Sequence, residues 1–438
     1  MGMIVFDAPG GAAVADPSET STEYRYWQKR ILIATIVGYA LYYFVRKNLS
    51  VAMPVMEKEL GIGKDQLGLF LTMHGVLYGV SRFANGVLAD RLNARWFMAG
   101  GLAICALLNV FFGMTTTLFG AASIVTAMGI FWAANGWFQG MGFPPCTRLM
   151  THWFSPHRLA TVMSVWNISH AIGAGAVLVL CGYLVKYDWR LCFFVPAGIA
   201  AVGAIGLALA LRDTPESLGL PPVAGTQDSR TEEGDPLWQT LKRFVFSNPY
   251  IWILGFANFF VYVIRYGVLD WGPTFLKEAR GVELSHAGWT VAAFEASGVL
   301  GMIAGGWVTD RVFGGRGARA CFFYMLGCGV AISVFWFFPS NSQLVNAGVL
   351  CLAGFFIYGP QCLIGIAAAN LATKRAAAAA AGLTGFLGYL STTVSGYGIG
   401  VLVKHYGWSA AFVLFGICTL IGALLFALCW PAKADGYE

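Results

Sequence analysis

Charged residues are scarce in this chain: only 11% of its 438 residues are Asp, Glu, Lys or Arg, whereas 57% are hydrophobic. A soluble globular domain has about 25% charged residues, so the composition excludes an ordinary soluble fold of this size. Long apolar runs separated by short polar loops instead predict a polytopic α-helical membrane protein that contacts the lipid bilayer. The net charge of +6 does not indicate nucleic-acid binding, because the basic residues lie in these short loops.

The chain also lacks the usual signatures of metal sites, disulfide frameworks and enzymes. Its ten cysteines show no C-x-x-C pattern and lie within or at the edges of apolar runs, so we expect them to be small core residues. No catalytic triad, phosphate-binding loop or carboxylate pair is present. We therefore expect no metal, no cofactor and no enzymatic activity.

Twelve apolar runs are long enough to cross a hydrocarbon core of about 30 Å. A hydrophilic segment at 212–248 separates six runs from the other six. This pattern predicts an all-α membrane protein with a flexible cytoplasmic tail at 1–23, a six-helix bundle at 24–211, a cytoplasmic linker at 212–248 and a second bundle at 249–438. The runs lie at about 31–56, 66–89, 96–115, 118–143, 158–185, 190–211, 250–276, 286–309, 319–338, 343–369, 376–403 and 409–431.

The loop charges predict an orientation. If the N-terminus is cytoplasmic, most loop Lys and Arg residues lie on the inner side of the membrane. The positive-inside rule then places both termini in the cytoplasm. We expect the membrane to be a bacterial inner membrane.

The two halves repeat each other at a nearly constant offset. Arg46 corresponds to Arg265 and His170 to Tyr389, each with an offset of 219 residues. Such an internal repeat is typical of transporters built from two related bundles.

A Gly-x-x-x-Asp-Arg loop occurs between the second and third run of each half. Its charged residues are Asp90 and Arg91 in the first half and Asp310 and Arg311 in the second. Both loops resemble the signature loop of the major facilitator superfamily, where the Asp and Arg pair across helix ends. We expect a role in gating for all four residues.

Arg46 and Arg265 interrupt the first apolar run of their halves. A cation in a span costs roughly 2.5 kcal/mol on insertion scales and should face a partner or a wet cavity. Two guanidiniums that converge at the midplane repel each other unless an anion lies between them, and their geometry suits phosphate. Pairing with helix carboxylates is the alternative, with Glu295 and Asp270 as the acids available in the second half.

Several other polar residues are weaker candidates. Lys47 points about 100° away from Arg46 on an ideal helix, so we expect it to contact a neighbouring helix or a carbonyl. Arg82 either lines the cavity or extends to the inner interface, and His170 either titrates with the ligand or packs as a neutral residue. His74 fits packing. Tyrosines that can donate hydroxyls to a polar ligand are Tyr39, Tyr43, Tyr262, Tyr266, Tyr358 and Tyr389.

Six long motifs resemble the organophosphate:phosphate antiporter family. They are Tyr43 to Asn48, Gly136 to Cys146, Ser164 to His170, Arg212 to Pro215, Arg265 to Trp271 and Gly385 to Leu390. The resemblance implies exchange of a phosphate ester for inorganic phosphate by alternating access. Arg46 and Arg265 match the family's phosphate-binding arginines, His170 its substrate-linked histidine and Glu295 an acidic residue of its eighth helix. Trp137 and Asn167 lie within the motifs and join the predicted substrate site.

The same resemblance leaves the substrate and the role open. Members that carry glycerol-3-phosphate and members that carry or sense hexose phosphates match almost equally well. Arg82 departs from the lysine usual in the family, and the eleventh run has no ionisable residue between Arg375 and Lys404, which favours a small ester. A membrane sensor of sugar phosphates with little transport is the alternative function. The oligomeric state is also open, with a monomer as the working assumption.

Overall fold

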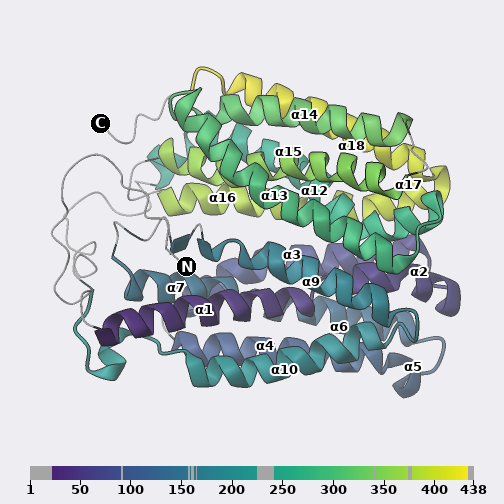
Figure 1. Ribbon diagram of the computed structural model, residues 1–438, viewed down its shortest axis with the longest axis horizontal. Coiled ribbons are helices and arrows are strands. Elements are labelled where there is room, and N and C mark those ends of the chain that lie inside the picture. The colour runs from purple at the N-terminus through teal and green to yellow at the C-terminus, as the bar shows by residue number, and fades with distance from the viewer. Residues whose placement is uncertain are drawn as a thin grey trace.

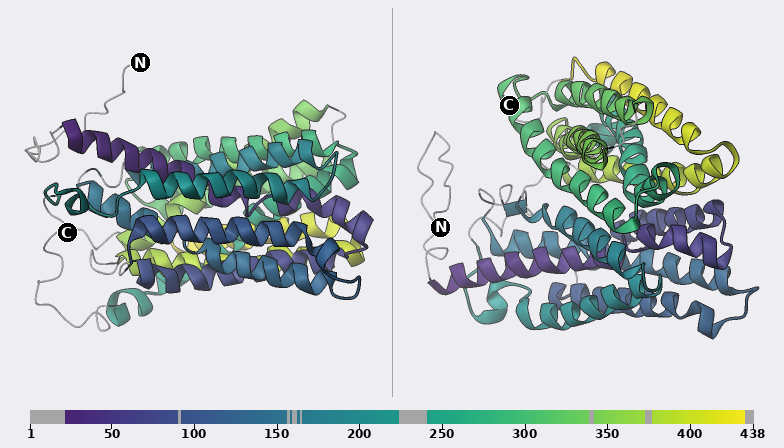
Figure 2. Two further views of the ribbon diagram at one scale, coloured as in Figure 1. Left: turned by 90° about the horizontal axis from the view of Figure 1, so that it is seen from below. Right: turned by 45° about the vertical axis from the view of Figure 1, so that its right-hand side comes forward.

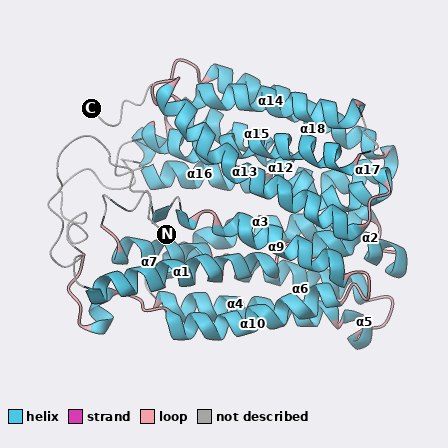
Figure 3. Cartoon of the chain, viewed as in Figure 1, coloured by secondary structure: helices cyan, strands magenta, loops and turns pink. Residues whose placement is uncertain are grey.

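A computed structural model describes residues 22–89, 92–155, 158, 162–163, 165–223, 241–338, 342–372 and 377–432. Over these residues the chain is entirely helical, with no strand (Figure 3). The predicted tail at 1–23 lies outside the described residues except for Thr22 and Glu23, which begin the first helix. The gating candidates Asp90 and Arg91 also lie outside them.

The helices form two groups that lie side by side (Figures 1 and 2). The first half is coloured purple to teal, and the second half is coloured green to yellow. The first half contains α1 (Thr22–Phe44), α2 (Leu49–Leu60), α3 (Lys64–Ala89), α4 (Ala94–Gly113), α5 (Thr115–Leu118), α6 (Ile124–Gln139), α7 (Phe143–Trp153), α9 (Ser169–Leu184) and α10 (Leu191–Ala210). The short η2 (Pro215–Leu218) and η3 (Lys242–Phe246) lie between the halves in sequence. The second half contains α12 (Pro249–Arg280), α13 (Leu284–Arg311), α14 (Gly317–Phe337), α15 (Gln343–Asn370), α16 (Ala377–Leu390), η4 (Thr393–Gly398), α17 (Ile399–Tyr406) and α18 (Trp408–Leu428).

Eight segments in the described residues are individually long and apolar enough to span a bilayer, and six of them belong to the second half. The predicted first span is not one helix, because α1 ends at Phe44 and α2 begins at Leu49. The predicted fourth span ends at 143, where α7 begins after a second break that follows α6 at Gln139. The helices of the first half are therefore more interrupted than those of the second, and one interruption coincides with Arg46.

The two halves contact each other closely at one end. Here α9 packs on α13, and α3 packs on η4 and α17. A Cβ atom on Gly288 would lie 2.5 Å from the carbonyl oxygen of Leu178 across this interface, so glycine permits the approach of the two backbones. Gly396 and Gly400 also lie against the main chain of α3, where a Cβ atom would not fit.

Ion pairs join the halves at the same end. The Nζ of Lys64 lies 2.9 Å from Oε1 of Glu278, and the Nζ of Lys404 lies 3.0 Å from Oδ1 of Asp65. The Lys186–Glu283 pair is 2.5 Å long. The loop charges predict that this end is the outer one. Because these pairs join the halves at this end, the conformation is closed on the predicted outer side.

Thr72 makes two hydrogen bonds across the closed interface. Its hydroxyl donates to the carbonyl oxygen of Thr392 at 2.7 Å and accepts from the amide of Tyr397 at 2.8 Å. These groups flank or belong to η4, a π-helical turn that leaves main-chain groups without their ordinary helical partners. A side chain of the first half thus compensates an irregular turn in the second.

Candidate substrate site

Arg46 lies in the break between α1 and α2. The amides of Arg46 and Lys47 both bond to the carbonyl oxygen of Tyr43, at 3.2 Å and 2.9 Å, so the regular α-helical ladder ends there. The carbonyl oxygens of Tyr42 and Val45 lose their helical partners as a result. Within a bilayer such groups must find other donors.

Three buried amide side chains supply these donors. Gln139 donates to the carbonyl oxygen of Tyr42 at 3.0 Å. Asn109 and Asn135 both donate to that of Val45, at 3.1 Å and 2.8 Å. The three residues are at most 2% exposed and come from α4 and α6. The break is therefore a stabilised feature of the fold, and it determines the position from which Arg46 extends.

The Arg46 guanidinium is buried and contacts aromatic rings. Its Cζ lies 4.1 Å from the ring centre of Tyr78 and 5.3 Å from that of Tyr43. Among the described residues it has no ion pair and no side-chain hydrogen bond. Cation–π contacts offset only part of the cost of burying the charge. The Arg46 side chain is thus able to bind an anion.

Arg265 occupies the matching position in the second half but on an unbroken helix. It is 2% exposed, in the middle of α12, with its Cζ 4.6 Å from the ring centre of Tyr358. Its Nη2 lies 3.9 Å from Oε1 of Glu295, beyond hydrogen-bonding distance, and Tyr358 donates its hydroxyl to the same oxygen. The Nε and Nη2 of Arg265 have no hydrogen-bond partner. Glu295 is therefore a nearby counter-ion that leaves donors of Arg265 available.

Lys47 pairs with a carboxylate of the opposite half. Its Nζ lies 2.5 Å from Oδ1 of Asp270, and both side chains are buried. Lys47 therefore contacts a neighbouring helix, α12, which is one of the two expected kinds of partner. Asp270 belongs to the central part of α12, not to a helix end.

Five of the predicted tyrosines gather near the arginines. The ring of Tyr389 lies 5.5 Å from that of Tyr262 and 6.2 Å from that of Tyr266, centre to centre. It also lies 4.9 Å from Tyr78 of the first half, a residue that the sequence did not single out. Tyr39 contacts Tyr43 at 5.6 Å and Tyr78 through their hydroxyls at 3.2 Å.

His170 lies between the same groups. Its ring is 6.1 Å from that of Tyr43 and 6.4 Å from that of Tyr358, so it links the surroundings of both arginines. Its Nε2 is buried without a hydrogen-bond partner. His74 also has an unpartnered Nε2, but its ring packs on Trp132 at 5.3 Å, in keeping with the packing role.

Arg82 faces the interface between the halves. Its Cζ lies 3.7 Å from the ring centre of Phe143 and 6.0 Å from that of Tyr389. Arg82 therefore contacts aromatic rings of both halves. In the described residues no carboxylate pairs with Arg82.

Other predicted residues are less closely connected to the arginines. The Trp137 side chain is exposed, and its carbonyl accepts a hydrogen bond from Ser81. Asn167 is half-buried in the turn before α9. Asp310 and Arg311 are exposed at the end of α13 and form no ion pair with another described residue.

The fold and the site together define a membrane carrier of two helical bundles with a cationic centre between them. A family model described as Major Facilitator Superfamily matches residues 35–396. The chain is 39% identical to the "Glycerol-3-phosphate transporter" of Bacillus subtilis (strain 168), over 95% of each chain. It is 38% identical to the "Probable hexose phosphate transport protein" of Chlamydia pneumoniae, over 96% of this chain and 94% of the relative. It is 35% identical to "Membrane sensor protein UhpC" of Escherichia coli (strain K12), over 96% of this chain and 95% of the relative.

The chain belongs to the Major Facilitator Superfamily and, within it, to the organophosphate:phosphate antiporter family. Its fold is also similar to a crystal structure of a bacterial homolog of the human lysosomal transporter Spinster in an inward-facing, unoccupied conformation. That similarity has a TM-score of 0.72 at 16% identity and covers 94% of this chain and 96% of the other, so it supports the fold alone.

Proposed function

We propose that this protein exchanges an organic phosphate ester for inorganic phosphate by alternating access. The proposal depends most on one observation: two buried guanidiniums occupy matching positions of the two halves, and Arg46 has no counter-ion among the described residues. The relatives named as transporters of glycerol-3-phosphate and of hexose phosphate support this substrate class.

The charges around the site favour a dianion. Among its described residues, Arg46, Arg82, Arg265 and Lys47 carry four positive charges, and Asp270 and Glu295 carry two negative charges when ionised, which leaves two positive charges. A phosphate ester or hydrogen phosphate with two negative charges would neutralise this excess. Guanidiniums also bind phosphate oxygens in a bidentate manner.

Charge balance also explains exchange. Movement of the halves toward each other at the inner end would bring Arg46 and Arg265 into a drier site, where their repulsion is less screened. A bound dianion removes this repulsion and permits the change of conformation. A carrier with an empty site would therefore change conformation slowly. After phosphate is released on one side, a second anion would have to bind before the carrier changes conformation again.

In the cell we expect the protein in a bacterial inner membrane, with both termini cytoplasmic and a monomer as the transporting unit. The loop charges support this orientation. The conformation described above would then be open toward the cytoplasm, because the Lys64–Glu278, Lys404–Asp65 and Lys186–Glu283 pairs lie at the opposite end.

Substrate counterflow tests the proposal. Liposomes that contain the purified protein are loaded with inorganic phosphate, and uptake of labelled phosphate, glycerol-3-phosphate or glucose-6-phosphate is measured. We expect uptake by the wild type and its loss in Arg46→Ala and Arg265→Ala. Arg280→Ala is the matched control, because Arg280 lies on the same helix as Arg265 but donates to the carbonyl of Phe335 outside the site. Normal exchange by either site variant would refute the paired site.

A sensor of sugar phosphates is the second candidate. It is supported by relatives named "Membrane sensor protein UhpC", which are 35% and 36% identical to this chain. A sensor would bind its ligand without substantial counterflow. Saturable binding of glucose-6-phosphate in detergent, together with uptake no greater than in protein-free liposomes, would favour the sensor.

A further inference from the structure

Three arginines converge on the last turn of α10, away from the substrate site. The Nε of Arg30 donates to the carbonyl oxygen of Ala210 at 3.1 Å, and its Nη2 to that of Leu209 at 3.0 Å. Arg95 donates through Nε to Ala208. Arg212 donates through Nη1 to Leu209 at 3.1 Å and to Leu211 at 2.7 Å. Four consecutive carbonyls thus hold three guanidiniums together.

One cation would suffice to cap this helix end. The C-terminus of a helix carries about half a negative charge, so three arginines leave a large positive excess. None of the three forms an ion pair with a described residue. Partial burial and the neighbouring Arg95 and Arg30 lower the pKa of Arg212. The lowered pKa is consistent with three cations that repel one another.

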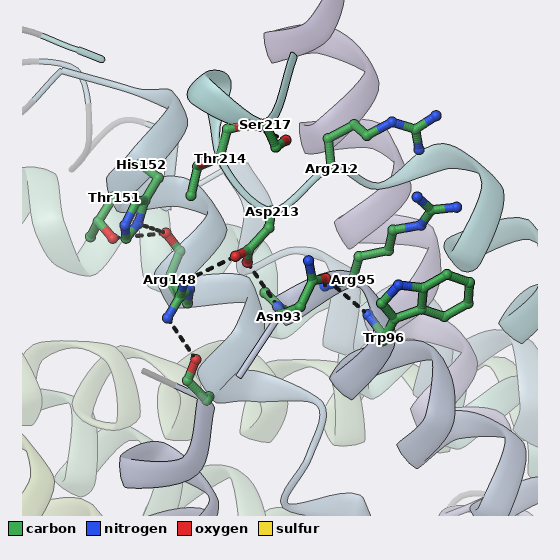
Figure 4. A network of polar contacts seen from close by, with 12 residues as sticks. Asn93, Arg95, Trp96, Arg148, Thr151, His152, Arg212, Asp213, Thr214 and Ser217 are labelled. Carbon is green, nitrogen blue, oxygen red and sulfur yellow. Dashed lines mark hydrogen bonds and ion pairs between the residues drawn. The ribbon is translucent and has the colours of Figure 1, made fainter. Parts of the chain in front are cut away.

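The nearest carboxylate belongs to a different contact network. Asp213 accepts a hydrogen bond from the amide of Ala94 at 2.8 Å and pairs with Nη2 of Arg148 at 3.0 Å. Figure 4 shows Asp213 directed toward Arg148, whereas Arg95 and Arg212 extend together toward the other side, next to Trp96. Asp213 therefore does not neutralise the arginine cluster.

Aromatic residues surround the cluster as they do at a membrane interface. The Cζ atoms of Arg30 and Arg212 lie 4.9 Å and 5.3 Å from the ring centre of Trp27. Arg95 lies 4.6 Å from the ring of Trp96, which is 59% exposed. Tryptophan and tyrosine are enriched at the level of lipid headgroups.

The position of the cluster favours lipid over the transported substrate. The helices α4 and α10 lie on the side of the first half that is remote from the second half (Figure 1). On α10, Val202, Ile205 and Leu209 are each more than 60% exposed, as expected for a lipid-facing surface. A soluble anion on its way to Arg46 and Arg265 would enter between the halves and not at this perimeter.

We propose that Arg30, Arg95 and Arg212 bind the phosphate headgroup of an anionic phospholipid in the cytoplasmic leaflet. The phosphodiester would accept hydrogen bonds from guanidinium donors that the helix carbonyls leave free, and it would neutralise part of the excess charge. Trp27 and Trp96 would contact the glycerol and upper acyl region.

The second half offers a matched control. Arg319 lies in the first turn of α14 and donates through Nε to the carbonyl oxygen of Trp430 at 3.3 Å, with its Cζ 5.0 Å from the ring of Trp430. In the first half, Arg95 makes the corresponding contact, because it donates to the carbonyl oxygen of Ala208 in the last turn of α10. Only one guanidinium occupies the site among the described residues, so it should bind an anionic headgroup weakly.

Native mass spectrometry of the full chain can test the proposal. The purified protein is titrated with phosphatidylglycerol and, separately, with phosphatidylcholine in the same detergent. We expect one tightly bound phosphatidylglycerol, and binding at least tenfold weaker in Arg95→Gln/Arg212→Gln. Arg319→Gln should bind like the wild type. If the double variant does not fold, Arg212→Gln alone serves, because this side chain lies on the surface and should still weaken binding severalfold.

Three results would overturn the assignment. One is that the cluster variants bind phosphatidylglycerol as tightly as Arg319→Gln does. Another is that the wild type binds phosphatidylcholine as tightly as phosphatidylglycerol. The third is displacement of phosphatidylglycerol by millimolar inorganic phosphate, which would identify the cluster as a site for a soluble anion.

Discussion

Lys47 and Asp270 form a buried ion pair of 2.5 Å that joins the two halves near Arg46 and Arg265. Lys47 directly follows Arg46 in the helix break, and Asp270 lies on α12 with Arg265. Because the two residues belong to different halves, opening of the closed end would separate them. The pair therefore stabilises this conformation, and a conformation open at this end would lack the pair.

Removing one partner of this pair should destabilise the protein more than removing both. Asp270→Asn leaves the Lys47 ammonium buried without a counter-ion, and such a loss costs about 3–5 kcal/mol. The double variant Lys47→Met/Asp270→Leu removes both charges and should recover most of that loss. Thermal unfolding in detergent of Lys47→Met, Asp270→Asn and the double variant measures the coupling between the two side chains. A double variant that is as unstable as Asp270→Asn would contradict the prediction.

Glu295 should weaken phosphate binding and accelerate its release. The carboxylate lies 3.9 Å from Nη2 of Arg265, so it competes with a phosphate oxygen for the guanidinium. In Glu295→Gln we expect phosphate to bind about fivefold more tightly or better, since a charged competitor has been replaced by a neutral one. We also expect slower counterflow, because release becomes more costly. Equilibrium binding and the turnover rate are measured on the same preparation.

Glu278→Gln is the control for this prediction. Glu278 pairs with Lys64 at the predicted outer end, far along α12 from Arg265. Its loss should leave phosphate affinity near that of the wild type. If Glu295→Gln binds phosphate more weakly than the control, Glu295 supports the anion instead of competing with it.

The sequence predicted the all-α fold and the pairing of Arg46 with Arg265 because these features depend on composition and on an internal repeat. A charge in an apolar run is conspicuous, and its counterpart at a constant offset confirms the pattern. For Lys47 a contact with a neighbouring helix was expected, but its partner Asp270 was not predicted, because a sequence does not show which carboxylate lies opposite. No Pro or Gly lies at the break, so the local sequence gave little warning that the helix ends at Phe44.

The amide residues around the break were also missed. Asn109, Asn135 and Gln139 are single polar residues in apolar helices, and a sequence does not show which carbonyls they will meet. An isolated buried amide in a span is itself a signal, because it must find a partner. Tyr78 was missed as well, because a sequence does not show that its ring will contact Arg46 and Tyr389.

Gln139 should affect phosphate affinity through the position of Arg46. In Gln139→Met the side chain keeps its approximate shape but no longer donates to the carbonyl of Tyr42. An unpaired carbonyl in a bilayer is costly, so the break should rearrange and displace Arg46. We expect phosphate to bind about tenfold more weakly, equivalent to about 1.4 kcal/mol. Equilibrium binding of labelled phosphate in detergent measures the change.

Gln28→Met separates this effect from a general loss of stability. Gln28 is also buried and donates to a main-chain carbonyl, that of Trp153, at 2.8 Å, but it lies far along α1 from the break. We expect it to lower the unfolding temperature without changing phosphate affinity. Equal affinities of Gln28→Met and Gln139→Met would exclude a positioning role for Gln139.

Acidification of the outer side should weaken the closed end through Glu283. The hydrogen bond and charge of Lys186 lower the pKa of Glu283, so the closed conformation favours the carboxylate. A carboxyl with a lowered pKa contributes stability above its ordinary value of about 4.3, and this contribution is lost as pH falls through the lowered pKa. His286, with its Nδ1 3.8 Å from Oε2 of Glu283, adds a second cation to the pair once protonated. The change should be small because the pair is exposed.

Labelling of Leu178→Cys from the outside can detect this opening, because Leu178 is buried where α9 meets α13. We expect its reaction with a membrane-impermeant thiol reagent to increase as the outer pH falls below about 4.5, after correction for thiol ionisation with a free thiol. Glu283→Gln and Lys186→Gln should label faster already at neutral pH and should respond less to acid, because each has lost the pair. An equal response to acid in all three backgrounds would show that another group controls the closed end.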